Sequence, residues 1–198
     1  MKKTALLIAA AVLLTGTAAA QDWKDALKKA ATAAADKASG GKLTEHALVG
    51  TWNYESPGVR FEGEDAVSEI GGTVLETTVA ERLEKVYLLL GIKPGFCSFT
   101  FGEEGAFSAV MGSRKLDGTY EFDAATHAVS LHFARGKFDL GSVQGHAYLS
   151  GEKLQLVFPA TKLFDMLTDL GSKISSLAAI SKLLDKYENV YIGFDFGK

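Results

Sequence analysis

The chain has 198 residues, of which 47% are hydrophobic and 23% charged, and its formal net charge at neutral pH is −3. This composition is typical of a folded globular protein and excludes a disordered, collagen-like or disulfide-stapled chain. The acidic excess also argues against a nucleic-acid partner, because binding to a phosphate backbone depends on clustered Lys and Arg.

The first twenty residues have the layout of a secretory signal peptide. A basic start precedes an apolar run from Ala5 to Leu14, and the small residues Ala18 and Ala20 are typical of a cleavage site before Gln21. The run is too short to cross a bilayer of about 30 Å, and no later stretch of about 20 apolar residues follows it. We therefore expect export, cleavage after about Ala20, and a periplasmic or secreted mature chain without a transmembrane segment.

Residues 21–41 are predicted to form an Ala-rich helix and a Gly-containing linker. Trp23, Leu27 and several alanines recur at helical spacing. This stripe offers little area for burial, so we expect the helix to dock loosely or to act as a tether. With only two large apolar side chains, a role at a membrane surface is the weaker interpretation.

From about residue 42 the pattern changes to short period-2 runs separated by turns, which predicts antiparallel strands. A first strand passes through Trp52 and Tyr54 and continues to Phe61 after a turn or bulge at Ser56-Pro57-Gly58. Further strands are predicted at about 96–101, 105–111, 114–122, 127–133, 137–149 and 152–158, and a last one at Val190 to Phe196. Their hairpin-length connections make a meander, and we expect the first and last strands to pair and close the sheet.

Two helical insertions interrupt the strands, at about 64–91 and 159–188. In the first, the Gly71-Gly72 pair predicts a break into a short and a longer helix, because glycine is unfavourable inside a helix. In the second, we expect two helices separated at Gly171, the later one capped by Ser172. The insertions could pack on each other, plug the sheet or dock a partner.

These elements predict a mainly β protein with helical insertions, an α+β chain whose eight or so strands form an up-and-down antiparallel barrel. The predicted organisation is a signal peptide over 1–20, the Ala-rich helix and linker over 21–41, and the barrel with its insertions over 42–198.

Two short motifs carry a resemblance to known proteins. Leu48-Val49-Gly50-Thr51-Trp52 is similar to the opening Gly-x-Trp strand of lipocalin-like barrels, and Asp117-Gly118-Thr119-Tyr120 is similar to strand starts in small bacterial members. Over about residues 43–198 the layout resembles an uncharacterised family of secreted bacterial lipocalin-like proteins. The resemblance implies a barrel that can hold a hydrophobic ligand, and it implies no established activity.

The sequence contains no constellation that indicates catalysis or metal binding. The histidines are His46, His127, His132 and His146. None belongs to a helical i, i+4 pair, and we place His127 and His132 on opposite faces of one strand. A hairpin at Arg135-Gly136 would bring His127 near Gln144. The usual motifs for acyl transfer, phosphate binding and dinucleotide binding are absent too. We predict a non-enzymatic protein with no catalytic residues, no metal and no cofactor.

Apolar side chains on the inward phase of the strands are the candidate binding residues. In a small barrel such side chains either fill the core or line a cavity for one ligand, and both arrangements need the same alternation. The candidate ligand-binding residues are Trp52, Tyr54, Phe99, Phe101, Phe107, Met111, Tyr120 and Phe122. The hydroxyls of Tyr54 and Tyr120 could orient a ligand. Cys97 shares the phase of Phe99 and Phe101, so we expect a buried thiol.

Two functions fit this pattern. The first is an exported binding protein that holds a small apolar or amphipathic ligand inside the barrel. The alternative is an envelope protein–protein interaction or structural module with a filled barrel and no ligand.

Overall fold

The computed structural model describes residues 17–62, 69–134, 140–170, 175–185, 187 and 189–198. The helices in this part of the chain are α1 (Thr17–Ala38), α2 (Lys42–Leu48), α3 (Glu69–Leu89), α4 (Ala160–Leu170) and α5 (Ser175–Leu184). The strands are β1 (Gly50–Phe61), β2 (Cys97–Phe101), β3 (Ala106–Met111), β4 (Arg114–Asp123), β5 (Ala128–Phe133), β6 (Ser142–Ser150), β7 (Lys153–Pro159) and β8 (Val190–Gly197). Residues 1–16 of the predicted signal peptide lie outside the described residues.

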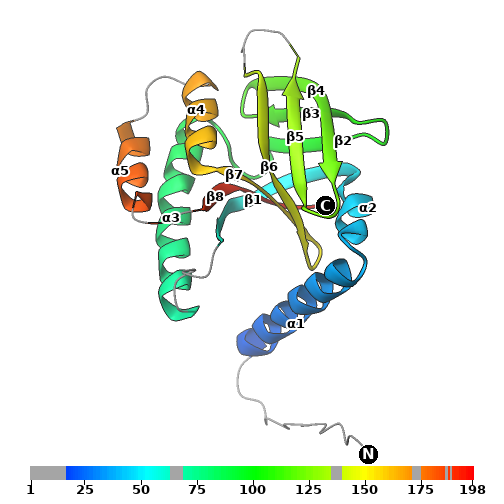
Figure 1. Cartoon of the computed structure of the whole chain (residues 1–198). Helices are drawn as coiled ribbons and strands as arrows, with labels where there is room; N and C mark the ends of the chain where they lie inside the picture. The colour runs from blue at the N-terminus through cyan, green and yellow to red at the C-terminus, as the bar shows by residue number, and fades with distance from the viewer. Residues whose placement is uncertain (1–16, 63–68, 135–139, 171–174, 186, 188) are drawn as a thin grey trace, which may run out of the picture.

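The eight strands form a closed barrel in chain order, and every neighbouring pair is antiparallel. β1 also pairs with β8, where Tyr54 faces Phe196 and Pro57 faces Phe194. The register shifts between Tyr54 and Ser56, at the predicted bulge. The eight-stranded up-and-down barrel with helical insertions is therefore confirmed, including its closure by the first and last strands (Figure 1).

Aromatic side chains on the inward phase of the strands pack together inside the barrel. Phe99, Phe194 and Phe196 are each at most 1% exposed, and their ring centroids lie 5.4–5.9 Å apart. Burying a side chain of this size contributes roughly 1.5–3 kcal/mol. The buried thiol predicted for Cys97 is confirmed, and burial raises the pKa of that thiol to about 12. The alternation in the sequence thus identifies the core correctly.

The barrel end next to α2 is sealed around Trp52. Its indole Nε1 donates a hydrogen bond of 2.8 Å to the carbonyl of Leu48, and the Lys198 ammonium lies 4.7 Å from the ring centroid. The same ammonium donates to the carbonyls of Ala47 and Val49, at 3.2 and 3.3 Å. A cation at the C-terminal end of a helix is favourable. These contacts tie the last residue of the chain to the beginning of β1.

Helices α3, α4 and α5 gather on one side of the barrel, and α1 and α2 lie on the other (Figure 1). α3 packs against β1 and α5. Its Tyr87 hydroxyl donates to the carbonyl of Gly193 at 2.9 Å, and its ring stacks on Phe194 with a centroid separation of 5.1 Å. Tyr87 therefore belongs to the same aromatic core as the strands. No helix in the described part of the chain is both long enough and apolar enough to cross a membrane.

The predicted break in the first insertion is wrong. α3 runs without interruption from Glu69 through Gly71-Gly72 to Leu89. The glycine pair lies in the first turn, where backbone N–H groups have no partner within the helix, so it costs less there than in the interior. The expected short helix falls mainly on residues 64–68, and the separation at Gly171 with its cap at Ser172 also lies outside the described residues.

Candidate functional site

The structure brings the eight predicted binding residues together in the barrel core. Trp52, Tyr54, Phe99, Phe101, Phe107 and Met111 are each 3% exposed or less, and Tyr120 and Phe122 are partly buried against them. The Tyr120 hydroxyl donates to the carbonyl of Gly102 at 2.8 Å, so the backbone already occupies it. The part of these residues in ligand binding stays a prediction.

Tyr54 differs from Tyr87 and Tyr120, whose hydroxyls donate to backbone carbonyls, because its own hydroxyl makes no such bond to a described residue. Its ring meets Tyr87, Phe194 and Phe196 edge to face, with centroids 6.0–6.4 Å apart. Burial raises the pKa of this hydroxyl well above its usual value, and nearby negative charge adds to the effect. The group therefore keeps its proton and is available as a donor inside the barrel.

A cleft of about 440 Å³ lies outside the barrel wall, between the C-terminal half of α1 and residues of β6, β7 and β8 that mostly face outward. We call it the α1 cleft. Its lining includes Lys29, Asp36, Arg60, His127, Tyr148, Gln155 and Asp195, and it contains none of the eight residues predicted from the sequence. The cleft brings together residues from α1, β1, the β4–β5 turn and three further strands.

The corner between α1 and α2 positions one wall of the cleft. Gly41 has a φ of +80°, and its N–H donates a 2.9 Å hydrogen bond to the carbonyl of Asp36, which ends α1. A Cβ at this position would collide with the backbone carbonyl of Ala124 in the β4–β5 turn. Glycine is therefore required for the corner to press against the barrel.

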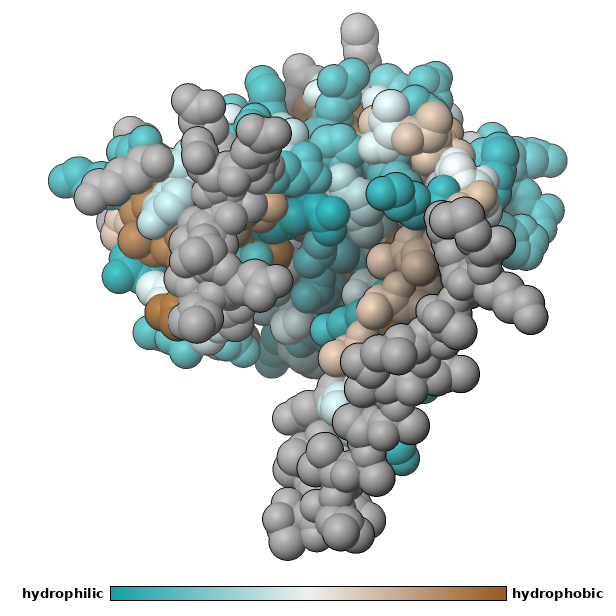
Figure 2. Space-filling model, turned by 60° about the horizontal axis from the view of Figure 1, so that its bottom comes forward, coloured by the Kyte–Doolittle hydropathy of each residue, from teal (hydrophilic) through white to brown (hydrophobic). Residues whose placement is uncertain are grey.

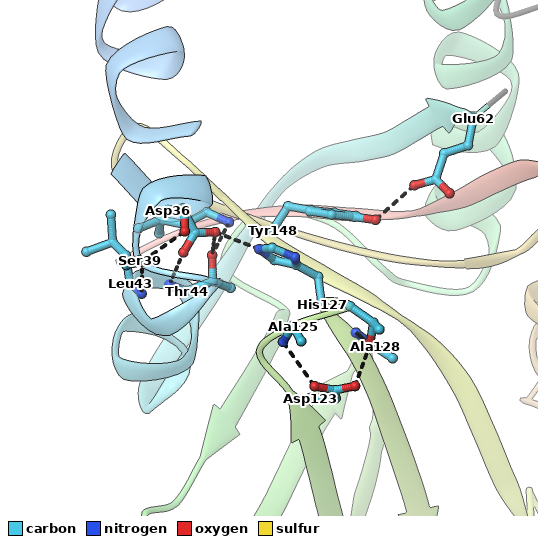
Figure 3. Close-up of polar contacts among 12 residues, drawn as sticks. Asp36, Ser39, Leu43, Thr44, Glu62, Asp123, Ala125, His127, Ala128 and Tyr148 are labelled. Atoms are coloured by element: carbon cyan, nitrogen blue, oxygen red, sulfur yellow. Dashed lines mark hydrogen bonds and ion pairs between the residues drawn. The ribbon is translucent and has the colours of Figure 1, made fainter. Parts of the chain in front are cut away.

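The buried carboxylate of Asp36 joins both helices to the barrel (Figure 3). It accepts hydrogen bonds from the N–H and hydroxyl of Thr44, at 2.9 and 2.5 Å, and lies 2.6 Å from Nε2 of His127. The Thr44 hydroxyl in turn accepts from the N–H of Leu149 at 3.2 Å. Burial raises the pKa of Asp36, but the hydrogen bonds from Thr44 and His127 outweigh it and leave that pKa below its usual value. The carboxylate is therefore charged at neutral pH.

The predicted placement of His127 is wrong. His127 ends the β4–β5 turn with a left-handed φ of +58°, and His132 lies on β5. The register pairs Ala128 with His146 and Ser130 with Gln144. The register therefore differs from that of a hairpin at Arg135-Gly136, two residues that lie outside the described part. His127 lies opposite Ala147 instead of Gln144, and the N–H of Ala147 donates to the His127 carbonyl at 3.0 Å.

Tyr148 is held rigidly at the inner wall of the cleft. Its ring stacks on His127 with centroids 5.1 Å apart, and the Arg60 guanidinium lies 3.8 Å from its centroid. Its hydroxyl donates to Glu62 at 2.8 Å, and Arg60 donates to the same carboxylate oxygen at 3.1 Å. Figure 3 shows the tyrosine spanning from the Asp36 side to Glu62. Burial, and then the bond to Glu62, raise the pKa of Tyr148.

His146 lies next to Tyr148 with one unsatisfied ring nitrogen. Its ring stacks on Tyr148, with centroids 5.9 Å apart, and meets Tyr191 edge to face at 5.0 Å. Nδ1 is buried and has no hydrogen-bond partner among the described residues. Burial lowers the pKa of His146, so the ring is mostly neutral at pH 7. A buried polar atom of this kind usually has a partner, either protein or an ordered water.

Asp195 stands at the far wall of the cleft and behaves in the opposite way to Asp36. Gln155 donates a 3.1 Å hydrogen bond to its carboxylate. Burial raises the pKa of Asp195 to about 6, although Gln155 and the nearby Lys153 and Lys29 partly offset that effect. The two carboxylates of one cleft therefore titrate far apart.

This arrangement is suited to holding a molecule. Asp36 orients His127 as the carboxylate of a catalytic triad does. In a triad the hydroxyl is hydrogen-bonded to the histidine, whereas the Thr44 hydroxyl is hydrogen-bonded to Asp36 itself. Among the described residues no hydroxyl or thiol is hydrogen-bonded to the other nitrogen of His127. The same part of the chain contains no group of three or more His, Cys, Asp or Glu that could hold a metal ion.

Sequence reasoning missed the α1 cleft, although one signal was available. His146 and Tyr148 occupy the polar, outward phase of their strand, where an aromatic pair needs an explanation. Asp36 and Asp195 offered no such signal, because only the fold brings residues so distant in the chain together.

A closed eight-stranded barrel with external helices and a cleft at its wall defines a small lipocalin-like protein. Residues 23–198 match the lipocalin-like domain family DUF4923, and the chain belongs to that family. The lipocalin-like resemblance drawn from Gly50-Thr51-Trp52 is thereby confirmed. The crystal structure of a DUF4847 family protein from Bacteroides vulgatus ATCC 8482 is 14% identical, with a TM-score of 0.38, and the match covers 78% of this chain and 96% of that one. No curated protein matches.

Proposed function

We propose that this protein is an exported, non-enzymatic binding protein that holds a small amphipathic molecule in the α1 cleft. The observation that carries the proposal is the rigid Tyr148 wall, which Arg60, His127 and Glu62 hold in place beside a cleft of about 440 Å³. Binding sites of this kind combine a preformed hollow with a few polar groups that fix orientation. The predicted signal peptide supports export to the periplasm or the medium.

The lining of the cleft favours an amphipathic ligand. Ala33 and Leu149 offer apolar contact, and Gln155 and Asp195 offer hydrogen-bonding groups on the opposite wall. Each Å² of apolar ligand surface removed from water contributes about 25 cal/mol, so useful affinity needs no reactive residue. The His146 ring stacks on Tyr148 without lining the cleft, and its buried, unsatisfied nitrogen can pair with a water.

The barrel interior is the second candidate location, favoured by the unpaired hydroxyl of Tyr54. A ligand there would have to displace side chains that are at most 3% exposed. That displacement costs packing energy, which ranks the interior below the cleft. An envelope interaction or structural module without a ligand is the alternative function.

Native mass spectrometry of the chain isolated after export, followed by organic extraction, tests this proposal. We expect a bound small molecule in the wild type and in Tyr54→Phe, and its loss in Tyr148→Ala. His132→Ala is the matched control, because it removes an exposed aromatic side chain from the same sheet. Circular dichroism verifies that each variant is folded.

Two other results would redirect the proposal. Loss of the molecule in Tyr54→Phe with retention in Tyr148→Ala would move the site into the barrel. A wild-type chain that carries no small molecule and takes up none from an envelope extract would favour the interaction module.

A further inference from the structure

Helix α1 contacts the barrel with its polar side. Lys28 pairs with Glu152 on the β6–β7 turn at 3.4 Å, and Lys29, Ala33 and Asp36 line the cleft. At about 100° per residue, positions 29, 33 and 36 fall on one side of the helix. Only Asp36 among the side chains described on α1 is buried, so the helix is anchored mainly at its C-terminal end.

The apolar stripe of α1 points away from the barrel. Trp23 is 60% exposed and Leu27 is 56% exposed. The alanines of the same stripe, Ala30, Ala31 and Ala34, are exposed as well. These five residues fall within an arc of roughly 100° centred opposite Asp36. An amphipathic helix normally buries such a stripe, and here nothing in the described part of the chain covers it.

The charges that border this stripe are cationic. Lys24 lies along one edge and Lys37 along the other, and both are exposed. Asp36 carries its charge on the barrel side, where the carboxylate is buried and hydrogen-bonded to Thr44 and His127. The outward surface of α1 therefore has an apolar centre with lysines on both edges, which we call the α1 outer face.

The apolar side chains of the helices on the other side of the barrel are more scattered. Figure 2 shows brown side chains on the side of α3–α5, next to a largely teal barrel surface. Exposed apolar residues on α3 include Val74, Leu88 and Leu89, at 64%, 53% and 72% exposure. Val74 lies fourteen to fifteen positions before the other two, about four turns away along the helix axis. The α1 outer face is the more continuous surface.

We propose that the α1 outer face docks on an anionic lipid surface. Tryptophan and leucine insert at the level of the headgroups, and lysines at the edges attract acidic lipids. A second copy of this chain fits less well, because pairing two such faces would bring lysine borders together without a described carboxylate between them. This docking is independent of the ligand in the cleft and holds the cleft close to the membrane.

Tryptophan fluorescence tests the proposal directly. The chain has two tryptophans, and Trp52 is 1% exposed in the core, so a change on adding vesicles reports Trp23. The chain isolated after export, with its N-terminus determined by mass spectrometry, is titrated with vesicles of phosphatidylcholine and phosphatidylglycerol. We expect a blue shift and weaker quenching by acrylamide, with affinity at least about fivefold lower for pure phosphatidylcholine or at high salt.

A pair of matched variants assigns the binding to α1. Leu27→Glu should lower the affinity for the anionic vesicles about tenfold, and Leu89→Glu should leave it unchanged although it alters an even more exposed leucine on α3. Circular dichroism confirms equal helix content. The pair remains informative if the isolated chain retains the apolar run Ala5 to Leu14, because both variants then carry it.

Three results would overturn the proposal. The first is an unchanged spectrum with every vesicle. The second is equal loss of binding in Leu27→Glu and Leu89→Glu. The third is a wild-type dimer in light scattering that Leu27→Glu abolishes, without vesicle binding, which would assign the face to a second copy.

Discussion

The barrel interior and the α1 cleft lie on opposite faces of the same strands and follow opposite rules. On β8, Phe194 and Phe196 point into a core of packed rings, and Asp195 between them points to the cleft. The interior gains its free energy from burial and needs no particular partner for each residue. The cleft depends on individual hydrogen bonds between distant segments. Folding stability is thus concentrated inside the barrel, and the candidate site lies outside it.

The largest expected effect is on the interior. Phe194→Ala removes a ring that contacts Tyr54, Tyr87 and Phe99, and should lower the free energy of unfolding by about 3–5 kcal/mol. Urea denaturation measures it. Phe96→Ala is the control, since Phe96 is 55% exposed and should change stability by about 0.5 kcal/mol or less. Similar small effects at both positions would contradict a packed interior.

Asp36→Ala tests the anchor of the cleft. It leaves the Thr44 hydroxyl and His127 without their acceptor and should cost about 2–3 kcal/mol. Because the pKa of Asp36 is lowered in the folded state, the stabilisation is present above its unfolded value near 3.8 and is lost as pH falls through the folded pKa. Denaturation curves from pH 7 to pH 2 measure this. If the stability difference between the wild type and Asp36→Ala already begins to fall well above pH 5, the titrating group is not Asp36.

Gly41→Ala tests the contact between the α1–α2 corner and the barrel. A Cβ there collides with the carbonyl of Ala124, and the φ of +80° is itself unfavourable for alanine. We expect the free energy of unfolding to fall by about 1–3 kcal/mol and hydrogen exchange in α1 and α2 to become faster. Gly40→Ala is the matched control, with a φ of +64° and nothing within 4 Å of the added Cβ, and should cost about 1 kcal/mol. Equal costs would mean that the corner does not press on the β4–β5 turn.

Unlike the preceding substitutions, Asp195→Asn should increase the stability of the fold, and it should do so only above mildly acidic pH. The folded-state pKa of about 6 exceeds the unfolded value of 3.8, so ionisation is penalised in the fold, increasingly from pH 4 to 6 and fully above it. The variant keeps an acceptor for Gln155 and should be more stable than the wild type by about 1–2 kcal/mol at pH 7.5, with little difference below pH 4. Thermal unfolding at the two pH values measures this. A variant less stable than the wild type at pH 7.5 would show that the charge is used.

The fold was predictable because its determinants are local. Period-2 alternation gave the strands and their inward faces, and the apolar strands at Trp52 and Phe194 were correctly expected to close the sheet. The cleft was not predictable, because it depends on register. A three-residue shift in the β5–β6 pairing decides whether His127 lies opposite Gln144 or Ala147, and no local pattern sets the length of that connection.

The side of α1 that contacts the barrel was not predictable either. Its apolar stripe suggested the buried side, but the buried contact is made by Asp36. A single charged residue with three good hydrogen-bonding contacts outweighs a stripe made mostly of alanine, whose burial gains little.

A crystal structure of the chain isolated after export, with whatever it carries, tests the central claim most directly. We predict electron density for a small molecule in the α1 cleft, beside Tyr148 and Gln155, with the rings of Phe99 and Phe194 still in contact. Density inside the barrel, with Tyr54 and its neighbouring rings displaced around it, would contradict that claim.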